Sequence, residues 1–454
     1  MRKHISIKFW IIFWLISILF LVGWFFYWNS RGLENQTALE KIISFIPIGE
    51  ETKDEWKAIA YFTENILESD QEKTFMLLFQ NNLEIRPGGG FIGAFGVLKI
   101  KDGKVTSLQI HDTGNFDGRI PDTEEPPYPM KETLAIKSWK LRDSNYSPDF
   151  SVNAKKAEYF YNLGQGQEKF DGIVGITTNV LTSFLSATGP VEIQGYPGTY
   201  ADENAVIALE YQVEKAFEQQ GIERGERKSV MNDLANAIIE KIFQLDNSQK
   251  IELAKIILED LNQKNIQLYF NDYEWQKRAV DAGWAGLVDQ KWNKDYLMTV
   301  DANLGAFKSD YFVDRSIDYT INLSGEVPKA NLKITYKHNA KEKDWMTKDY
   351  LTYLRVYVPD KAWLIDSKNF GMPRFENDLG KKVFASIVKV PLGQSRTVEI
   401  NYTLSKEITN NYNFLAQKQP GINDEPINLH IIDKNGTKKD YETILNSDIV
   451  LSSL

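Results

Sequence analysis

Cysteine is absent from the 454 residues, and histidine occurs only four times. The lack of cysteine excludes disulfides, thiolate metal sites and cysteine nucleophiles together. His4, His111, His338 and His430 lie far apart without the spacing of metal ligands, and no GxSxG motif accompanies them to indicate a Ser-His-Asp triad. We therefore expect neither zinc nor haem.

An excess of basic residues is also lacking. The chain has 53 Lys and Arg against 62 Asp and Glu, a net charge of −9, and no basic face stands out along it. Because the neutralisation of phosphates along a nucleic acid needs such a face, nucleic acid is excluded as a partner. Apolar residues make up 43% of the chain, as in an ordinary globular protein, and the length suits two or three domains.

One long apolar run is present near the amino terminus. Residues 9–28 carry no charge, and as a helix they would span ~30 Å, the thickness of a bilayer's hydrocarbon core. Basic residues precede the run and few follow it, so we expect a cytoplasmic tail at residues 1–8 and an extracytoplasmic bulk in a single-pass protein of the cell membrane. A cleaved signal peptide would have a shorter core and would end in small residues, whereas bulky aromatic residues end this run.

The remaining chain divides into three parts. Residues 29–71 are predicted to form a juxtamembrane spacer with a helix from Lys53 to Leu67. Residues 72–305 alternate strand and helix patterns, which favours a mixed α/β domain. Residues 306–454 contain short strands separated by turns, which is typical of an all-β sandwich.

A polar loop follows the first predicted strand of the α/β domain. It contains Asn81 and Asn82, then Arg86, and then Gly88, Gly89 and Gly90. Gly88, Gly90 and Gly93 fit GxGxxG, but the segment after them reads as a β-hairpin and not as the helix that a dinucleotide needs. We expect a binding loop, or alternatively a plain connection between strands, and no nucleotide cofactor.

Arginines are the best candidate ligands in this domain. They fall in loops or at the ends of elements, where guanidinium groups could bind phosphate bidentately: Arg86, Arg119, Arg142, Arg224 and Arg227. Asp112 and Asp143 are candidate ligands for Mg²⁺ beside them. The alternatives are solvated surface charge for each arginine and strand-end hydrogen bonding for His111 and Asp112.

Several motifs resemble one bacterial family. The sequences LLFQNNLEIRPGGGFIGAFG, LRDSNYSPDFS, DGIVGITTNVLTSFLSATGPVEI and FLAQKQPG occur in the order seen in membrane-anchored proteins of domain of unknown function 4012. The resemblance covers most of residues 72–420. It implies a single-pass anchor with an exported domain, and it implies no chemistry.

A second resemblance does imply chemistry. The α/β region is similar in its order of features to LytR-CpsA-Psr enzymes, which attach glycopolymers from polyprenyl-pyrophosphate carriers to the bacterial cell wall. RGERKSVMNDLANAI resembles their Arg-x-x-Arg segment, so Arg224 and Arg227 would bind pyrophosphate, Arg86 would match the arginine after their first strand, Mg²⁺ would be the cofactor and an apolar groove would take the prenyl chain. Our candidate catalytic residues are Arg86 and Asp143. Two aspartates of that family are replaced, by the Pro87-Gly88 pair and by Gly221, so the metal is held differently or the domain binds without catalysis.

Two functions follow as expectations. The first is the binding, with or without transfer, of a polyprenyl-linked sugar or cell-wall polymer, which predicts that Arg86, Arg224 and Arg227 converge at the mouth of an apolar groove. The second is a non-enzymatic surface or scaffold protein that contacts another envelope component, which predicts a shallow first domain.

Overall fold

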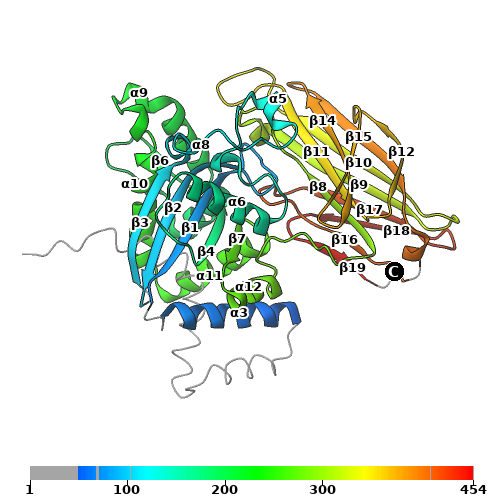
Figure 1. The fold of residues 1–454 in the computed structure, drawn as a ribbon, viewed down its shortest axis with the longest axis horizontal. Helices are drawn as coiled ribbons and strands as arrows, with labels where there is room; N and C mark the ends of the chain where they lie inside the picture. The colour runs from blue at the N-terminus through cyan, green and yellow to red at the C-terminus, as the bar shows by residue number, and fades with distance from the viewer. Residues whose placement is uncertain (1–49, 68–70, 103, 410, 453–454) are drawn as a thin grey trace, which may run out of the picture.

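The computed structural model describes residues 50–67, 71–102, 104–409 and 411–452. The predicted cytoplasmic tail, the predicted transmembrane helix at residues 9–28 and most of the predicted spacer lie outside these residues. Within the described ranges, no helix is both long and apolar enough to cross a membrane. Two regions lie side by side: a mixed α/β region and a C-terminal β region (Figure 1).

The α/β region is built on one five-stranded mixed sheet. β1 runs antiparallel to β2 and parallel to β4, while β3 and β7 close the two edges antiparallel to their neighbours. The strands, in their order across the sheet, are β3 (Lys104–Asp112), β2 (Phe91–Lys101), β1 (Lys73–Asn81), β4 (Gly172–Thr177) and β7 (Ile266–Phe270). The mixed α/β class is therefore confirmed.

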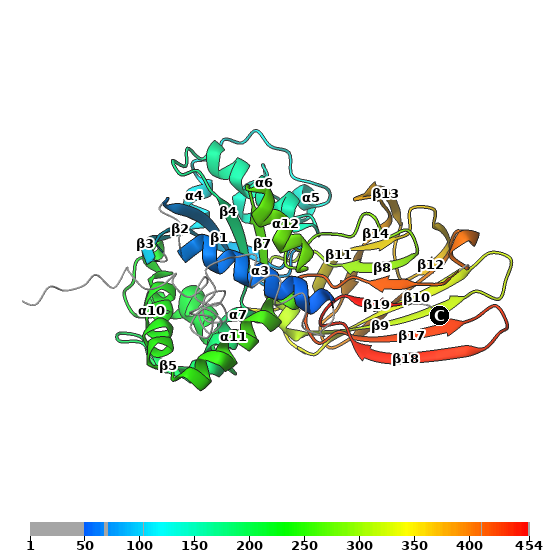
Figure 2. The ribbon, with the colours of Figure 1, turned by 90° about the horizontal axis from the view of Figure 1, so that it is seen from below.

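Both faces of this sheet are covered. Successive residues of β1 point to opposite faces, and they are apolar on each. Phe75 and Leu77 belong to the core cluster on one face, while Met76 and Leu78 belong to the cluster on the other. α6 packs on one side of the sheet, and α7, α10 and α11 pack on the opposite side (Figure 2). The result is three layers, with the sheet in the middle.

The helical and short elements of the α/β region follow in chain order. They are α3 (Glu50–Leu67), α4 (Thr113–Asp117), α5 (Met130–Leu134), η2 (Leu141–Asp143), α6 (Phe150–Leu163), α7 (Asn179–Thr188), β5 (Val191–Glu192), β6 (Thr199–Tyr200), α8 (Ala205–Tyr211), η3 (Gln212–Ala216), α9 (Phe217–Gln219), η4 (Arg224–Glu226), α10 (Ser229–Gln244), α11 (Asn247–Asn262) and α12 (Tyr273–Asp281).

The C-terminal β region consists of two six-stranded sheets that share one buried core. The first sheet contains β12 (Trp363–Lys368), β15 (Ser395–Thr403), β10 (Lys329–His338), β9 (Val313–Asn322), β17 (Pro426–Ile432) and β18 (Lys438–Ile444), in that order, and η5 (Ser309–Phe312) precedes β9. The second contains β13 (Arg374–Asp378), β14 (Lys381–Val390), β11 (Tyr350–Val358), β8 (Asp295–Val300), β16 (Phe414–Ala416) and β19 (Ile449–Leu451), and η6 (Lys406–Thr409) lies before β16. The β-rich C-terminal part is confirmed, and β8 joins it from before residue 306.

The outer face of the second sheet is the contact surface for the α/β region. Met130 and Tyr146 from the α/β region share a buried cluster with Tyr296 and Tyr353 of the sheet. Arg355 on β11 donates through Nη2 to the carbonyl oxygen of Tyr146 at 2.9 Å. The two regions are thus joined by buried apolar and polar contacts.

A buried carboxylate lies at the start of β8. Asp295 is fully buried and accepts hydrogen bonds from the hydroxyls of Tyr319, at 2.8 Å, and Tyr412, at 2.6 Å. Burial raises the pKa of Asp295 to about 6, although these tyrosine donors and the Tyr296 backbone amide oppose the shift. The folded state therefore holds a proton that the unfolded chain releases at lower pH.

This shift predicts the pH dependence of stability. The ordinary pKa of the carboxyl is 3.8, so between that value and about 6 only the unfolded chain is ionised. The contribution of Asp295 to the free energy of unfolding is then present below pH 3.8 and lost as the pH rises through about 6. The loss is roughly 3 kcal/mol from a two-unit shift.

We expect Asp295→Asn to remove this part of the pH dependence, because the amide has no proton to lose. Urea unfolding followed between mildly acidic and neutral pH measures it as the difference between the two proteins. Asp314→Asn changes an exposed carboxylate on β9 and serves as the control. Parallel wild-type and Asp295→Asn stability curves would contradict the assignment.

Candidate functional site

An apolar cavity of about 600 Å³ lies between the sheet and the helices on one of its faces. Its floor comes from alternate residues of the strands, including Leu77, Phe79 and Ile176, and its wall comes from α7, α8 and α10. The volume falls in the range of ~300–1,000 Å³ that is usual for small-molecule sites. We call this cavity the groove.

The spacing of apolar residues on α10 explains the groove's wall. Met231, Leu234, Ala235, Ile238 and Ile242 recur at intervals of three and four, which places them on one face of the helix, and all five line the groove. Each also belongs to the hydrophobic cluster on this side of the sheet or packs against it. The groove is therefore an incompletely filled part of the core.

The lining of the groove also contains charged side chains, which form ion pairs with one another or with neighbouring residues. Five cations line it, and every one has a carboxylate partner: Arg86 with Glu84 and Asp143, Arg142 with Asp117, Arg227 with Glu214, Lys228 with Asp112, and Lys308 with Glu210. Burial raises the pKa of the Glu210 carboxyl although Lys308 opposes the shift. Six partner carboxylates face these five cations, so the arrangement is a charged end of mixed sign on an apolar groove.

Arg86 is held by protein groups on nearly all sides. Its side chain is 2% exposed, and it donates to Asp143 at 3.2 Å, Glu84 at 2.9 Å and the carbonyl oxygen of Asn303 at 2.9 Å. Burial lowers the pKa of Arg86, but Glu84 and Asp143 outweigh that effect, so the net pKa is raised and the guanidinium stays charged. Arg86 thus joins the two regions at the edge of the groove.

The glycine loop that contains Arg86 docks against the C-terminal β region. Gly89 and Gly90 have φ of 131° and 152°, which only glycine adopts readily. Gly421, in the segment after β16, lies so close that an added Cβ would be 2.1 Å from the oxygen of Gly89. Gln419 in the same segment donates to the carbonyl oxygens of Arg86 and Asp301. The predicted binding loop therefore packs tightly against the C-terminal β region. We call this contact, between residues 86–90 and residues 419–421, the joint.

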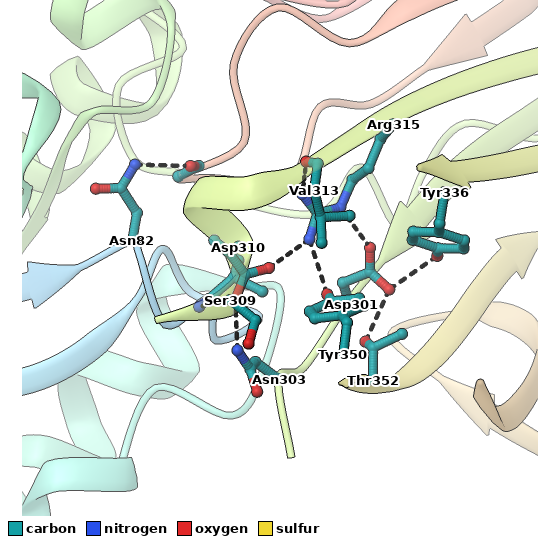
Figure 3. A network of polar contacts seen from close by, with 12 residues as sticks. Asn82, Asp301, Asn303, Ser309, Asp310, Val313, Arg315, Tyr336, Tyr350 and Thr352 are labelled. Atoms are coloured by element: carbon teal, nitrogen blue, oxygen red, sulfur yellow. Dashed lines mark hydrogen bonds and ion pairs between the residues drawn. The ribbon is translucent and has the colours of Figure 1, made fainter. Parts of the chain in front are cut away.

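A buried ion network continues this joint into the β region (Figure 3). Arg315 on β9 binds Asp301 at 3.0 Å and also pairs with Asp310. Asp310 accepts from the amide nitrogens of Asn303 and Ile85, at 2.7 and 3.0 Å. Asn82 donates at 3.0 Å to the carbonyl oxygen of Gly421 on the other side of the joint. Asn82 is thereby a joint residue, whereas Asn81 lines the groove and donates to Glu210.

The structure brings only some of the predicted arginines together. Arg86, Arg142 and Arg227 line the groove. Arg224 is exposed on η4 and is not among the groove-lining residues that the structure describes. Arg119 lies beside a second cavity, with its guanidinium 5.4 Å from the ring centre of Phe116.

The carboxylates predicted to bind Mg²⁺ do not form a fitting donor set. Asp112 accepts from the amide of Asn115 through one oxygen and pairs with Lys228 at 2.6 Å through the other. Asp143 accepts from Arg86. Across the described part of the chain, no group of three or more His, Asp or Glu residues is placed to hold a metal ion. We therefore derive no step through Mg²⁺.

Several residues at the charged end were not found from the sequence. Lys228 follows Arg227 directly, and its charge next to that arginine was the available signal. Lys308 and Glu210 meet from distant parts of the chain, at 3.2 Å, so nothing local indicated them. Glu84 lies two residues before Arg86, where a paired carboxylate could have been suspected.

The fold and the groove define a mixed α/β domain with an apolar cavity, joined to a two-sheet β region. Residues 70–213 match the model of a family described as "Protein of unknown function (DUF4012)". The match covers the strands β1 to β4, the glycine loop and the helices α7 and α8 that wall the groove. It supports the resemblance over these residues, and FLAQKQPG lies beyond them.

No curated protein matches the chain. Among solved structures, it is similar to Lin1025 from Listeria innocua, with 11% identity and a TM-score of 0.27 over 48% of this chain and 80% of that one. It is similar to gbs0355 from Streptococcus agalactiae, with 12% identity and a TM-score of 0.31 over 49% and 76%. An M1 zinc metallopeptidase from Deinococcus radiodurans gives 8% identity and a TM-score of 0.17 over 29% and 38%. Such low scores carry no argument about fold or function.

Proposed function

We propose that the α/β domain binds a polyprenyl-pyrophosphate-linked glycopolymer, with the prenyl chain in the groove and the pyrophosphate at its charged end. The observation that carries this proposal is the combination of an apolar cavity of about 600 Å³ with five cations in its lining. A prenyl chain needs an apolar cavity, and its pyrophosphate needs cations within reach. Both halves of such an amphiphile have a counterpart here.

The proposed pyrophosphate ligands are Arg142, Arg227 and Lys228. Arg142 is 38% exposed, and Arg227 and Lys228 are 22% and 19% exposed, so each can reach a ligand. Arg86 and Asp143 are instead proposed to position the mouth of the groove, because their polar atoms already bind one another and their neighbours. The resemblance to LytR-CpsA-Psr enzymes supports the substrate class, and we propose binding without deriving a transfer step.

The proposed location is the cell membrane. An anchor at residues 9–28 would hold the α/β domain next to the bilayer that contains a polyprenyl carrier. The full chain should then be recovered from the membrane fraction, and its recovery from the soluble fraction would contradict the anchor.

Photocrosslinking tests the groove directly. The full chain in lipid nanodiscs is irradiated with a photoreactive farnesyl pyrophosphate, and the labelled peptides are identified by mass spectrometry. We expect label on α10, with competition by farnesyl pyrophosphate. Ala235→Trp should lower labelling by roughly tenfold, the equivalent of ~1.4 kcal/mol, because the indole would occupy the prenyl path.

Glu240→Trp provides the matched control, because Glu240 lies on the same helix but is exposed. The Glu240→Trp protein should be labelled as strongly as the wild type. Both variants keep Arg86 and Asp143, which are proposed to position the mouth of the groove. Labelling that is absent, or equal in the two tryptophan variants, would contradict the proposal. That result would favour the scaffold function, although the shallow first domain that this function predicts does not agree with the groove.

A further inference from the structure

A second cavity of about 570 Å³ adjoins the groove near the end of β3. Three residues, Ala94, Ile110 and Lys228, line both cavities, so the two cavities are neighbours at the charged end. We call this second space the side cavity. In contrast to the groove, most of its lining is polar: His111, Asp112, Asn115, Arg119, Glu226, Lys228, Ser229 and Asn232.

Arg119 and Lys228 are the two cations that line the side cavity, and they differ in their ion pairing. Two nearby carboxylates are committed elsewhere, since Asp117 pairs with Arg142 and Asp112 pairs with Lys228, while the exposed Glu226 also lines the cavity. Among the residues that the structure describes, no carboxylate pairs with Arg119. Its guanidinium lies over the ring of Phe116, at 5.4 Å, which leaves its hydrogen-bond donors available. Arg119 is exposed, so a ligand anion that enters the side cavity from solvent can reach these donors.

His111 supports this reading of the cavity. Its ring stacks on Phe95, with 4.9 Å between the ring centres. Burial lowers the pKa of His111, and the charge of Arg119 lowers it further, so the imidazole is neutral at pH 7. A neutral imidazole can donate and accept hydrogen bonds, as sugar hydroxyls require.

The other polar groups suit the same class of ligand. Asn115 and Asn232 carry amides, and Ser229 carries a hydroxyl that is 2.8 Å from the hydroxyl of Tyr196. Amide and hydroxyl groups around one guanidinium match a sugar that bears an anion. The position of the cavity, directly beyond Lys228, is where a sugar attached to the pyrophosphate would lie.

We propose that the side cavity binds the first sugar of the lipid-linked ligand and that Arg119 recognises a carboxylate or phosphate on that sugar. This inference rests on the proposed function, because the prenyl chain and pyrophosphate place the sugar. It adds a preference that the groove alone does not give: an anionic first sugar binds more tightly than a neutral one.

The test compares four ligands by competition for the farnesyl pyrophosphate label on the full chain in nanodiscs. They are farnesyl pyrophosphate itself and farnesyl-pyrophosphoryl adducts of glucose, glucuronic acid and phosphorylated glucose. We expect at least one anionic adduct to compete about tenfold more strongly than the glucose adduct, since a hydrogen bond to a charged group is stronger than one between neutral groups. The uronic and phosphorylated adducts distinguish a carboxylate from a phosphate.

Arg119→Gln should abolish this preference and leave competition by farnesyl pyrophosphate unchanged. Arg224→Gln, at an exposed cation outside both cavities, should retain the preference. Farnesyl pyrophosphate that binds without any preference among the sugars, or a preference that survives Arg119→Gln, would overturn this inference alone. Failure of farnesyl pyrophosphate to bind would overturn the proposed function and this inference with it.

Discussion

Gly421→Ala is expected to lower the free energy of unfolding by more than ~3 kcal/mol, because two independent penalties meet at this residue. The backbone of Gly421 has φ of 81°, where a Cβ costs ~1–2 kcal/mol in an L-residue. The new Cβ would also lie 2.1 Å from the oxygen of Gly89, a backbone atom that cannot rotate away. The glycine loop and the segment after β16 would have to separate, with loss of the hydrogen bond from Asn82 to the Gly421 carbonyl.

Gly436→Ala separates the two penalties. Gly436 has a nearly identical φ of 82°, and no atom lies within 4 Å of its added Cβ. Urea unfolding of both variants should therefore show a loss of only ~1 kcal/mol for Gly436→Ala. Equal losses in the free energy of unfolding of the two variants would mean that the glycine loop and the segment after β16 can separate at little cost. The unfolding transitions followed by tryptophan fluorescence and by far-UV dichroism should also become non-coincident only for Gly421→Ala.

The local pattern was sufficient for much of the fold. Hydrophobic spacing in the sequence predicts a helix from Ser229 to Phe243 and a strand from Ala330 to His338, and the bounds of α10 and β10 lie within one residue of these. Both are long and strongly periodic, so hydrophobic spacing alone defines them. β8 was missed, since Asp295–Val300 is buried throughout and pairs with strands more than 50 residues away, a relation that no local pattern records.

The candidate site was predictable only in part, for a physical reason. Arg227 and Arg142 were identified as cations in loops, and the structure places both at the groove. The role of Arg86 depends on Asn303, more than 200 residues later in the chain, which accepts from its Nη1 at 2.9 Å. An arginine beside three glycines has the same local sequence whether it faces a ligand or another domain. Only the packing of the second domain distinguishes the two.

Arg86→Met should destabilise the protein by ~3–5 kcal/mol, the usual effect of removing one partner from a buried ion pair. The loss comes from the buried carboxylates of Glu84 and Asp143, which keep their charge without the guanidinium. Burial already raises the pKa of Glu84, so its protonation in mildly acidic buffer should reduce the loss. Urea unfolding at neutral and mildly acidic pH measures both effects, and Arg224→Met, at an exposed arginine, is the control.

A triple variant decides what Arg86 does. If Arg86 only positions the joint, then Glu84→Gln and Asp143→Asn added to Arg86→Met should recover part of the stability, because no unpaired charge stays buried. This triple variant should also regain labelling by the photoreactive farnesyl pyrophosphate, since Arg142, Arg227 and Lys228 are intact. Recovered stability without recovered labelling would instead indicate that Arg86 is a ligand of the pyrophosphate. Arg86 would then join Arg142, Arg227 and Lys228 as a proposed ligand. No recovery of stability would mean that the hydrogen bond from Arg86 to Asn303, and not the relief of charge, holds the two regions together.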